Sequence, residues 1–293
     1  MLEFNVPLSL KIGPGVNSFG LAVKRNLHFK VCNIIDSEDF SIELDFCSEN
    51  LNKKNTIYIF EKIKKYISKE FPDIKKKITI SIYSEKPVLK LLNPDVSIIT
   101  GVFIAFFKVI FGECDQDKLL RTFKKISPDV ECAAAVLLGG LGVVDREKKS
   151  FLSIDWPTKW KIAVLKCSDE KVCKFEKIKS KDEFFFDSVS KAAVFITAVY
   201  SRHSDILFSS FQDNISYAMN RSGIPYVERI NLIGKTSKIA GLGFLKNDCG
   251  LIIVGEEKQL VDCIRRIEEI YNRNNIVFSK YRLDSESNGV GYD

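Results

Sequence analysis

The chain has 293 residues, of which 45% are hydrophobic and 28% are charged, and its formal net charge is +6. This length predicts two domains, and the composition is typical of an ordinary soluble globular protein. The densest lysine runs, at 62–69 and 75–77, alternate with apolar residues, as on solvated surfaces, so we do not expect nucleic-acid binding. The positive charge is compatible with a weak attraction for anionic metabolites.

The cysteines and the apolar stretches indicate a protein without a zinc site and without a membrane-spanning helix. The eight cysteines form no C-x-x-C pair, so we expect reduced, mostly buried thiols. His28 and His203 lie outside ligand spacing of any cysteine, which argues against a zinc site. The apolar stretch 96–111 contains Lys108 and is expected to be too short for a bilayer and to form a buried helix. With no secretory segment expected, the predicted location is the cytoplasm.

The first half of the chain predicts strands alternating with helices. The segment 56–71 places Ile57, Phe60, Ile63, Ile67 and Phe71 on one helical face, and Pro72 ends it. The other expected elements are strands at 8–11, 29–35, 40–46, 78–83 and 141–144, helices at 96–111 and 115–125, and a small apolar buried segment at 133–138.

Charges and Pro157 interrupt the periodicity at 146–156 and predict a boundary there. The expected elements beyond it are strands at 160–167, 238–245, 250–254 and 276–282, and helices at 184–200, 205–219 and 257–271. These patterns predict an α+β protein with two domains, 1–156 and 157–293.

Several segments, in the right order, resemble the GHMP small-molecule kinases, and homoserine kinases in particular. They are 6–21, 55–58, 133–141, 155–164, 195–202, 213–225 and 271–290. The resemblance implies an N-terminal domain like domain 2 of ribosomal protein S5 and a ferredoxin-like C-terminal domain. It implies that ATP, with Mg²⁺, phosphorylates L-homoserine to O-phospho-L-homoserine, a step toward threonine. It also implies a homodimer.

The stretch that corresponds to the family's phosphate loop reads PVLKLLNPDV at 87–96 and contains no glycine. Glycine lets the backbone N–H groups of such a loop approach phosphates closely, and proline removes a donor. One interpretation is an altered loop, with Lys90 and Asn93 near the phosphates, Asp95 as a Mg²⁺ ligand and Asn55 near the nucleotide. The alternative is that 93–95 caps the following helix.

The resemblance places the metal carboxylate and a substrate contact near 129–132. Glu131 stands where the family has aspartate, and Cys132 replaces an asparagine that binds the substrate. Asp129 or Glu131 could approach Mg²⁺ and take a catalytic role. The alternative is a surface turn with solvated carboxylates.

The remaining homoserine contacts also differ from the family. Lys11 stands where the family has asparagine and Asn17 where it has aspartate, so the charge that would meet the substrate's ammonium is lost. Lys174 and Arg221 are the cations nearest to the positions of two arginines that would bind its carboxylate, and they are otherwise surface cations. The hypotheses are a homoserine kinase with a rebuilt site, a catalytically inactive homologue that binds a metabolite or a protein, and a gene product in decay.

Overall fold

The computed structural model describes residues 2–14, 19–145, 150–168, 182–212, 224–245 and 250–292. The chain divides into two compact units. Unit 1 comprises Met1–Leu10, Gly20–Ser153 and Glu286–Asp293, and unit 2 comprises Lys11–Phe19 and Ile154–Ser285. Each unit therefore includes a short segment from the other end of the chain. The division into contiguous domains at 156/157 stays a prediction.

A mixed sheet forms the base of unit 1, and within the described residues it has seven strands. They are β1 (Glu3–Ile12), β2 (Phe19–Asp36), β3 (Ser41–Cys47), β4 (Lys76–Tyr83), β5 (Leu141–Asp145), β6 (Ser150–Ile154) and β11 (Gly291–Tyr292). The order is β11-β1-β2-β4-β3, with β5 paired to β2 and β6 paired to β5. β3 runs parallel to β4, whereas β4 and β5 pair with β2 in antiparallel fashion.

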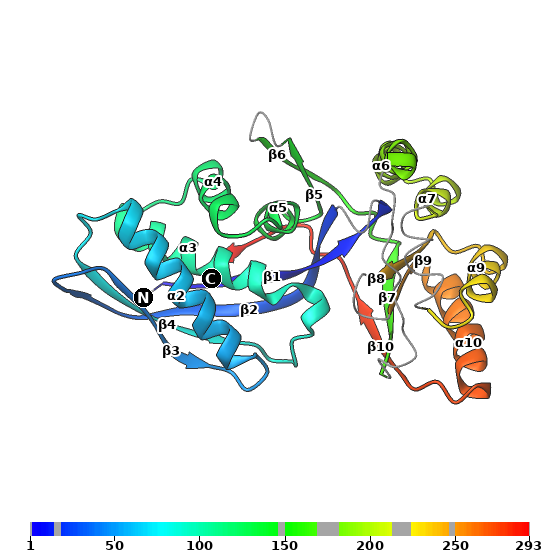
Figure 1. Cartoon of the computed structure of the whole chain (residues 1–293), viewed down its shortest axis with the longest axis horizontal. Coiled ribbons are helices and arrows are strands. Elements are labelled where there is room, and N and C mark those ends of the chain that lie inside the picture. Colours follow the sequence, from blue (N-terminus) through cyan, green and yellow to red (C-terminus); the bar gives the residue numbers. More distant parts are fainter. Residues whose placement is uncertain are drawn as a thin grey trace. The chain divides into compact units, whose positions relative to one another are not determined.

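Helices pack together over this sheet (Figure 1). They are α2 (Lys53–Glu70), α3 (Pro94–Phe111), α4 (Gln116–Ile126) and α5 (Val130–Leu138). The predicted buried face of α2 is confirmed at Phe60, Ile63 and Ile67, but Ile57 is 44% exposed and Ile59 is buried instead. At 3.6 residues per turn, successive three-residue steps drift around the helix, so Ile57 lies about 120° from Ile63, whereas Ile59 lies about 40° from it.

Helix α3 is the core helix of unit 1, and its residues 96–107 are all buried. Its 18 residues make it the one described helix that is long and apolar enough to cross a membrane by length and composition. The expectation that this stretch is too short was therefore wrong, because the helix starts at Pro94. Its predicted burial is confirmed: α3 packs against α2, α4 and α5 inside the unit.

Unit 2 carries an antiparallel four-stranded sheet in the order β10-β7-β9-β8. Its elements are β7 (Lys161–Cys167), α6 (Asp182–Ser201), α7 (Ser204–Ser210), α9 (Val227–Thr236), β8 (Gly241–Leu245), β9 (Gly250–Gly255), α10 (Glu257–Arg273) and β10 (Phe278–Leu283). The order places the unit's fourth strand beside its first and its third beside its second. With helices after the first and third strands, this is a ferredoxin-like βαββαβ arrangement, as the resemblance implied.

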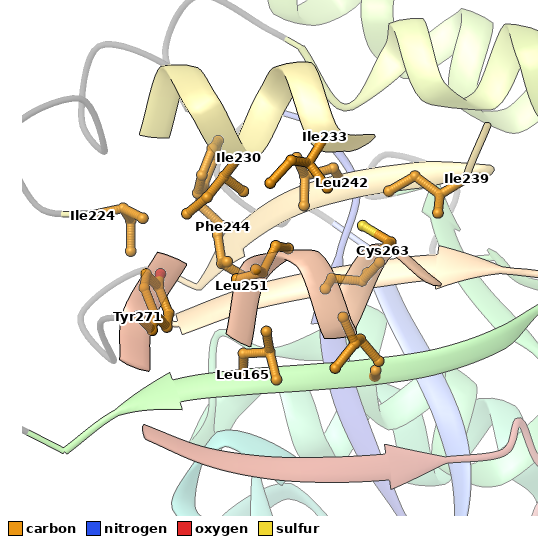
Figure 2. Packing of buried hydrophobic residues seen from close by; sticks show 14 of the residues in the cluster. Leu165, Ile224, Ile230, Ile233, Ile239, Leu242, Phe244, Leu251, Cys263 and Tyr271 are labelled. Carbon is orange, nitrogen blue, oxygen red and sulfur yellow. The ribbon is translucent and has the colours of Figure 1, made fainter. Parts of the chain in front are cut away.

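Helices α9 and α10 cover one face of the unit 2 sheet, and the side chains between the helices and the sheet form the hydrophobic core of the unit. Figure 2 shows side chains from both helices and from three strands meeting there: Leu165, Ile230, Leu242, Leu251 and Cys263. The thiol of Cys263 is completely buried, and burial raises its pKa to about 12. It is therefore a packing residue, as expected for most of the cysteines.

Candidate functional site

A pocket of about 420 Å³ opens in unit 1 between the start of α2 and the start of α3. We call it the α2/α3 pocket. Five residues that the sequence singles out line it: Asn55, Lys90, Asn93, Asp95 and Asp129. Residues 40 and more positions apart are thus brought together by the packing of α2 against α3. The volume lies in the range of small-molecule sites.

The segment where the resemblance places the phosphate loop folds as a short 3₁₀ turn, η1 (Lys90–Leu92). Leu91 and Leu92 are buried, so the turn is anchored to the core by its leucines. The N–H of Leu92 donates to the Leu89 carbonyl at 2.9 Å, and the N–H of Asn93 donates to the Lys90 carbonyl at 3.2 Å. These two donors are consumed within the turn itself.

The first turn of α3 follows directly. Asn93 is its N-cap residue and adopts a left-handed conformation with φ 45°. Its side chain does not cap the helix but donates toward the Ser9 carbonyl at 3.5 Å and toward the Cys132 sulfur at 3.6 Å. Pro94 has no N–H, and the N–H of Val96 donates to the Asn93 carbonyl at 3.0 Å. The capping prediction thus holds for the position of Asn93 and fails for its side chain.

The carboxylates give the α2/α3 pocket its charge. Asp95 lies in the first turn of α3, where the helix dipole favours an anion. Its Oδ1 accepts a hydrogen bond from Asn55 Nδ2 at 2.6 Å, which joins α2 to α3. Asp129 contributes a second carboxylate, and Lys90 is the one cation among the lining residues. The lining is therefore net negative.

The predicted metal ligands do not assemble into a cluster. Asp95 lines the pocket, whereas Glu131 is half-buried in the first turn of α5 and is not among the lining residues. In the part of the chain that the structure describes, no group of three or more His, Cys, Asp or Glu side chains could hold a metal ion.

Cys132 is buried on α5, and Asn93, a lining residue of the pocket, donates from Nδ2 toward its sulfur at 3.6 Å. Two glycines set its position: Gly20 of β2 and Gly142 of β5 pair with each other, and α5 packs on both. A Cβ at Gly20 would lie 2.5 Å from the Cys132 Cα, and one at Gly142 would collide with the Glu131 carbonyl. These glycines, which the sequence reasoning did not single out, let α5 approach the sheet.

The Gly139-Gly140 turn, part of the resemblance, also has a structural role. Both glycines have positive φ, and the N–H of Gly140 donates to the Glu286 carbonyl at 2.7 Å. A Cβ at Gly139 would collide with the Ser287 carbonyl. The turn therefore holds the C-terminal segment against unit 1.

The predicted homoserine contacts are placed only in part. Lys11 is half-buried near the end of β1, in the segment that belongs to unit 2. Asn17, Lys174 and Arg221 lie outside the described residues.

Comparison with known proteins gives a consistent result. No protein-family model matches the chain. It is 23% identical over 300 residues to a homoserine kinase of Caldicellulosiruptor saccharolyticus, covering 98% of the chain and 92% of the relative. It is also 23% identical over 316 residues to a homoserine kinase of Natranaerobius thermophilus, covering 99% of the chain and 97% of the relative.

Solved structures show the same fold. The homoserine kinase from Cytophaga hutchinsonii superimposes with a TM-score of 0.73 at 14% identity, over 100% of this chain and 97% of that one. The mevalonate kinase of Methanococcus jannaschii gives a TM-score of 0.62 at 14% identity, over 97% of each chain. The fold is therefore the α+β two-domain fold of the GHMP kinases, and the chain is a homoserine kinase-like protein within that fold.

Proposed function

We propose that this homoserine kinase-like protein binds a small neutral or zwitterionic metabolite in the α2/α3 pocket and transfers phosphate slowly or not at all. The relatives are homoserine kinases by name, and the resemblance implies ATP-dependent phosphorylation of L-homoserine on the way to threonine. A cytoplasmic location, which the sequence analysis expects, and a homodimer, which the resemblance implies, belong to the same proposal. The observation that carries it is the closed turn at residues 89–96.

Phosphoryl transfer depends on positioned donors and cations around the phosphates. At this turn, the N–H groups of Leu92, Asn93 and Val96 are donated to the chain's own carbonyls, and Pro94 has none. The N-terminus of a helix binds anions through backbone N–H groups that have no acceptor within the chain. With these donors consumed, the start of α3 offers ATP little of the stabilisation that a phosphate loop provides.

The charges of the pocket point the same way. A triphosphate would approach Asp95 and Asp129 with one cation, Lys90, to offset them. Like charges repel, and the repulsion grows where solvent is excluded. Asp95 already accepts a hydrogen bond from Asn55. In the described residues, no group of three or more His, Cys, Asp or Glu side chains could hold a metal ion. The residues present therefore do not fit Mg-ATP, whereas amides, carboxylates and one ammonium suit a neutral or zwitterionic ligand.

A working homoserine kinase is the second candidate. The observation in its favour is that Lys90, Asp95 and Asp129 line one pocket, so a cation and two carboxylates lie where the resemblance expects the nucleotide. This hypothesis requires that Asp95 leave Asn55 and that the turn at 89–93 open.

The test is homoserine-dependent release of ADP from Mg-ATP, measured beside the thermal unfolding midpoint. A ligand that binds only the folded state raises that midpoint. We expect no homoserine-dependent release of ADP. We also expect that any rise of the unfolding midpoint with Mg-ATP is the same in the wild type and in Lys90→Gln. The Cytophaga hutchinsonii homoserine kinase, assayed in parallel, is the positive control. Turnover by the wild type that Lys90→Gln abolishes would overturn the proposal in favour of the kinase.

A further inference from the structure

A second pocket in unit 1 has the opposite charge. It measures about 230 Å³ and is lined by residues of β2 and of the turn after β4, among them Lys24, Arg25, Asn26, Ser84, Glu85 and Lys86. We call it the basic pocket. We infer that it binds a small anionic metabolite bearing a phosphate group, held by Lys24, Arg25 and Lys86. This inference goes beyond the proposed function and does not depend on it.

The basic pocket lies where β2 changes its partner. β2 pairs with β5 at Gly20 and Leu21, and with β4 from His28 onward. The stretch 24–26 lies between these two pairings. β4 ends at Tyr83, opposite His28, and the two rings stack with centroids 4.5 Å apart. The opening in the sheet therefore leaves this edge of β2 to line a pocket.

The turn after β4 is held firmly beside β2. Ser84 is buried, and its Oγ donates to the Lys86 carbonyl at 2.9 Å and lies 3.5 Å from the Asn26 carbonyl. The Ser84 carbonyl accepts from Asn50 Nδ2 at 2.7 Å. These bonds fix the turn from both sides. The backbone at Lys86 is thereby held beside Lys24 and Arg25, so the turn itself needs no ordering step on binding.

The cations of the basic pocket differ from their neighbours in lacking partners. Three lysines elsewhere on β2 and β4 each pair with a carboxylate: Lys30 with Glu3 at 2.8 Å, Lys76 with Asp36 at 2.5 Å and Lys77 with Glu43 at 2.8 Å. Within the described ranges, no ion pair involves Lys24, Arg25 or Lys86. Glu85 is the one carboxylate among the lining residues, so the net charge is positive.

Converging cations repel one another, and a bound anion removes that repulsion. Arginine binds phosphate oxygens with a planar fork, and lysine binds them as a point charge. The small, concave pocket suits a single phosphate group, whereas nucleic-acid binding needs a basic stripe along a face. A solvated cluster of surface lysines is the plain alternative, and it predicts no saturable binding.

The experiment uses pyrophosphate and inorganic phosphate as probes of the whole chain, without nucleotide or Mg²⁺. Binding is measured by calorimetric titration, against sodium chloride of equal ionic strength. Lys24→Gln/Lys86→Gln removes two cations, and each lost charge-assisted contact should lower the affinity about tenfold. Lys65→Gln, an exposed lysine of α2 outside both pockets, is the matched control, and Lys90→Gln probes the α2/α3 pocket.

We expect saturable pyrophosphate binding by the wild type, Lys65→Gln and Lys90→Gln, and an affinity about 100-fold lower in the double variant. The conservative Arg25→Lys keeps the charge and should lose part of the affinity, which a folding defect would not mimic. Three results would overturn the inference. They are no saturable binding by the wild type, equal binding by all variants, and loss of binding in Lys90→Gln. Tighter binding of a single-stranded oligonucleotide than of pyrophosphate would instead indicate a nucleic-acid surface.

Discussion

The α2/α3 pocket and the basic pocket of unit 1 both take lining residues from the stretch 84–96, yet they carry opposite charge. The larger one, at the start of α3, has Asp95 and Asp129 against Lys90. The smaller one, at the end of β4, has Lys24, Arg25 and Lys86 against Glu85. Anions are thus disfavoured where the resemblance expects the phosphates of ATP and favoured a few residues earlier along the chain.

The difference has a local physical origin. The α2/α3 pocket depends on a helix start, where Pro94 has no N–H and the N–H groups of Asn93 and Val96 are bonded to the chain's own carbonyls, so fewer donors are left for an anion. The basic pocket depends on a strand edge and on charged side chains, so it needs no special backbone. We propose from this difference that the fold is kept here while the anion-binding chemistry at the start of α3 is not.

The largest effect is expected from reversing the charge of the basic pocket. Lys24→Glu/Lys86→Glu replaces two favourable contacts by repulsion, so pyrophosphate binding should weaken by about 3 kcal/mol or more. Lys65→Glu/Lys258→Glu makes the same change in net charge at two exposed lysines outside both pockets. Calorimetric titration compares the two. An equal loss in both variants would show that overall charge, and not the basic pocket, attracts the anion.

A second variant tests the frame under the α2/α3 pocket. In Gly20→Ala, the new Cβ would lie 2.5 Å from the backbone of Cys132. We expect a loss of about 1–3 kcal/mol in the free energy of unfolding, measured by urea denaturation. Gly291→Ala is the control, because this glycine of β11 has open space around it and its φ is not positive. If Gly20→Ala costs no more than Gly291→Ala, α5 is not held against the sheet as described.

A third variant asks whether charge keeps nucleotides out of the α2/α3 pocket. Asp95→Asn removes one negative charge and keeps an oxygen that can accept from Asn55. Nucleotide affinity should rise by about tenfold, or about 1.4 kcal/mol. Asp73→Asn, an exposed aspartate outside the pocket, is the control. An unchanged affinity would mean that the closed turn alone excludes the nucleotide.

The smallest effect is expected at the bond that joins α2 and α3. Asn55→Ala removes the donor to Asp95, and because both groups reach solvent the cost should be about 1 kcal/mol of unfolding free energy. Urea denaturation measures it, with Asn52→Ala as a matched asparagine that lines the same pocket but is the N-cap of α2. In the double variant Asn55→Ala/Asp95→Ala, the penalty of the two changes should be less than additive. If the losses of unfolding free energy from the two substitutions are additive, Asn55 and Asp95 are not coupled by this hydrogen bond.

Periodicity found most of the fold, and its errors have physical causes. The helical face of Phe60, Ile63 and Ile67 was read correctly because three- and four-residue spacing marks a buried stripe. β6 was missed because its pairing with β5 is a tertiary contact next to a charged stretch. α9 was missed for two reasons. Its N-cap residue, Tyr226, is in a left-handed conformation and is not a usual capping residue, and Gly234 interrupts the helical pattern within it.

Motif order singled out five residues that line the α2/α3 pocket, because it carries information about position even where the residues differ from the family. They are Asn55, Lys90, Asn93, Asp95 and Asp129, and their roles stay predictions. The basic pocket was not anticipated beyond a general attraction for anionic metabolites. Its two halves lie far apart in the sequence, and only the register of β2 with β4 joins them.

The most direct test of the account is a titration of Mg-ATP into three proteins: the wild type, Lys90→Gln and Lys24→Gln/Lys86→Gln. We predict that saturable binding survives in Lys90→Gln and is lost in the double variant, because our proposals place the anion in the basic pocket and not in the α2/α3 pocket. Binding that is lost in Lys90→Gln and kept in the double variant would contradict it. That result would place the nucleotide in the α2/α3 pocket and restore the kinase hypothesis.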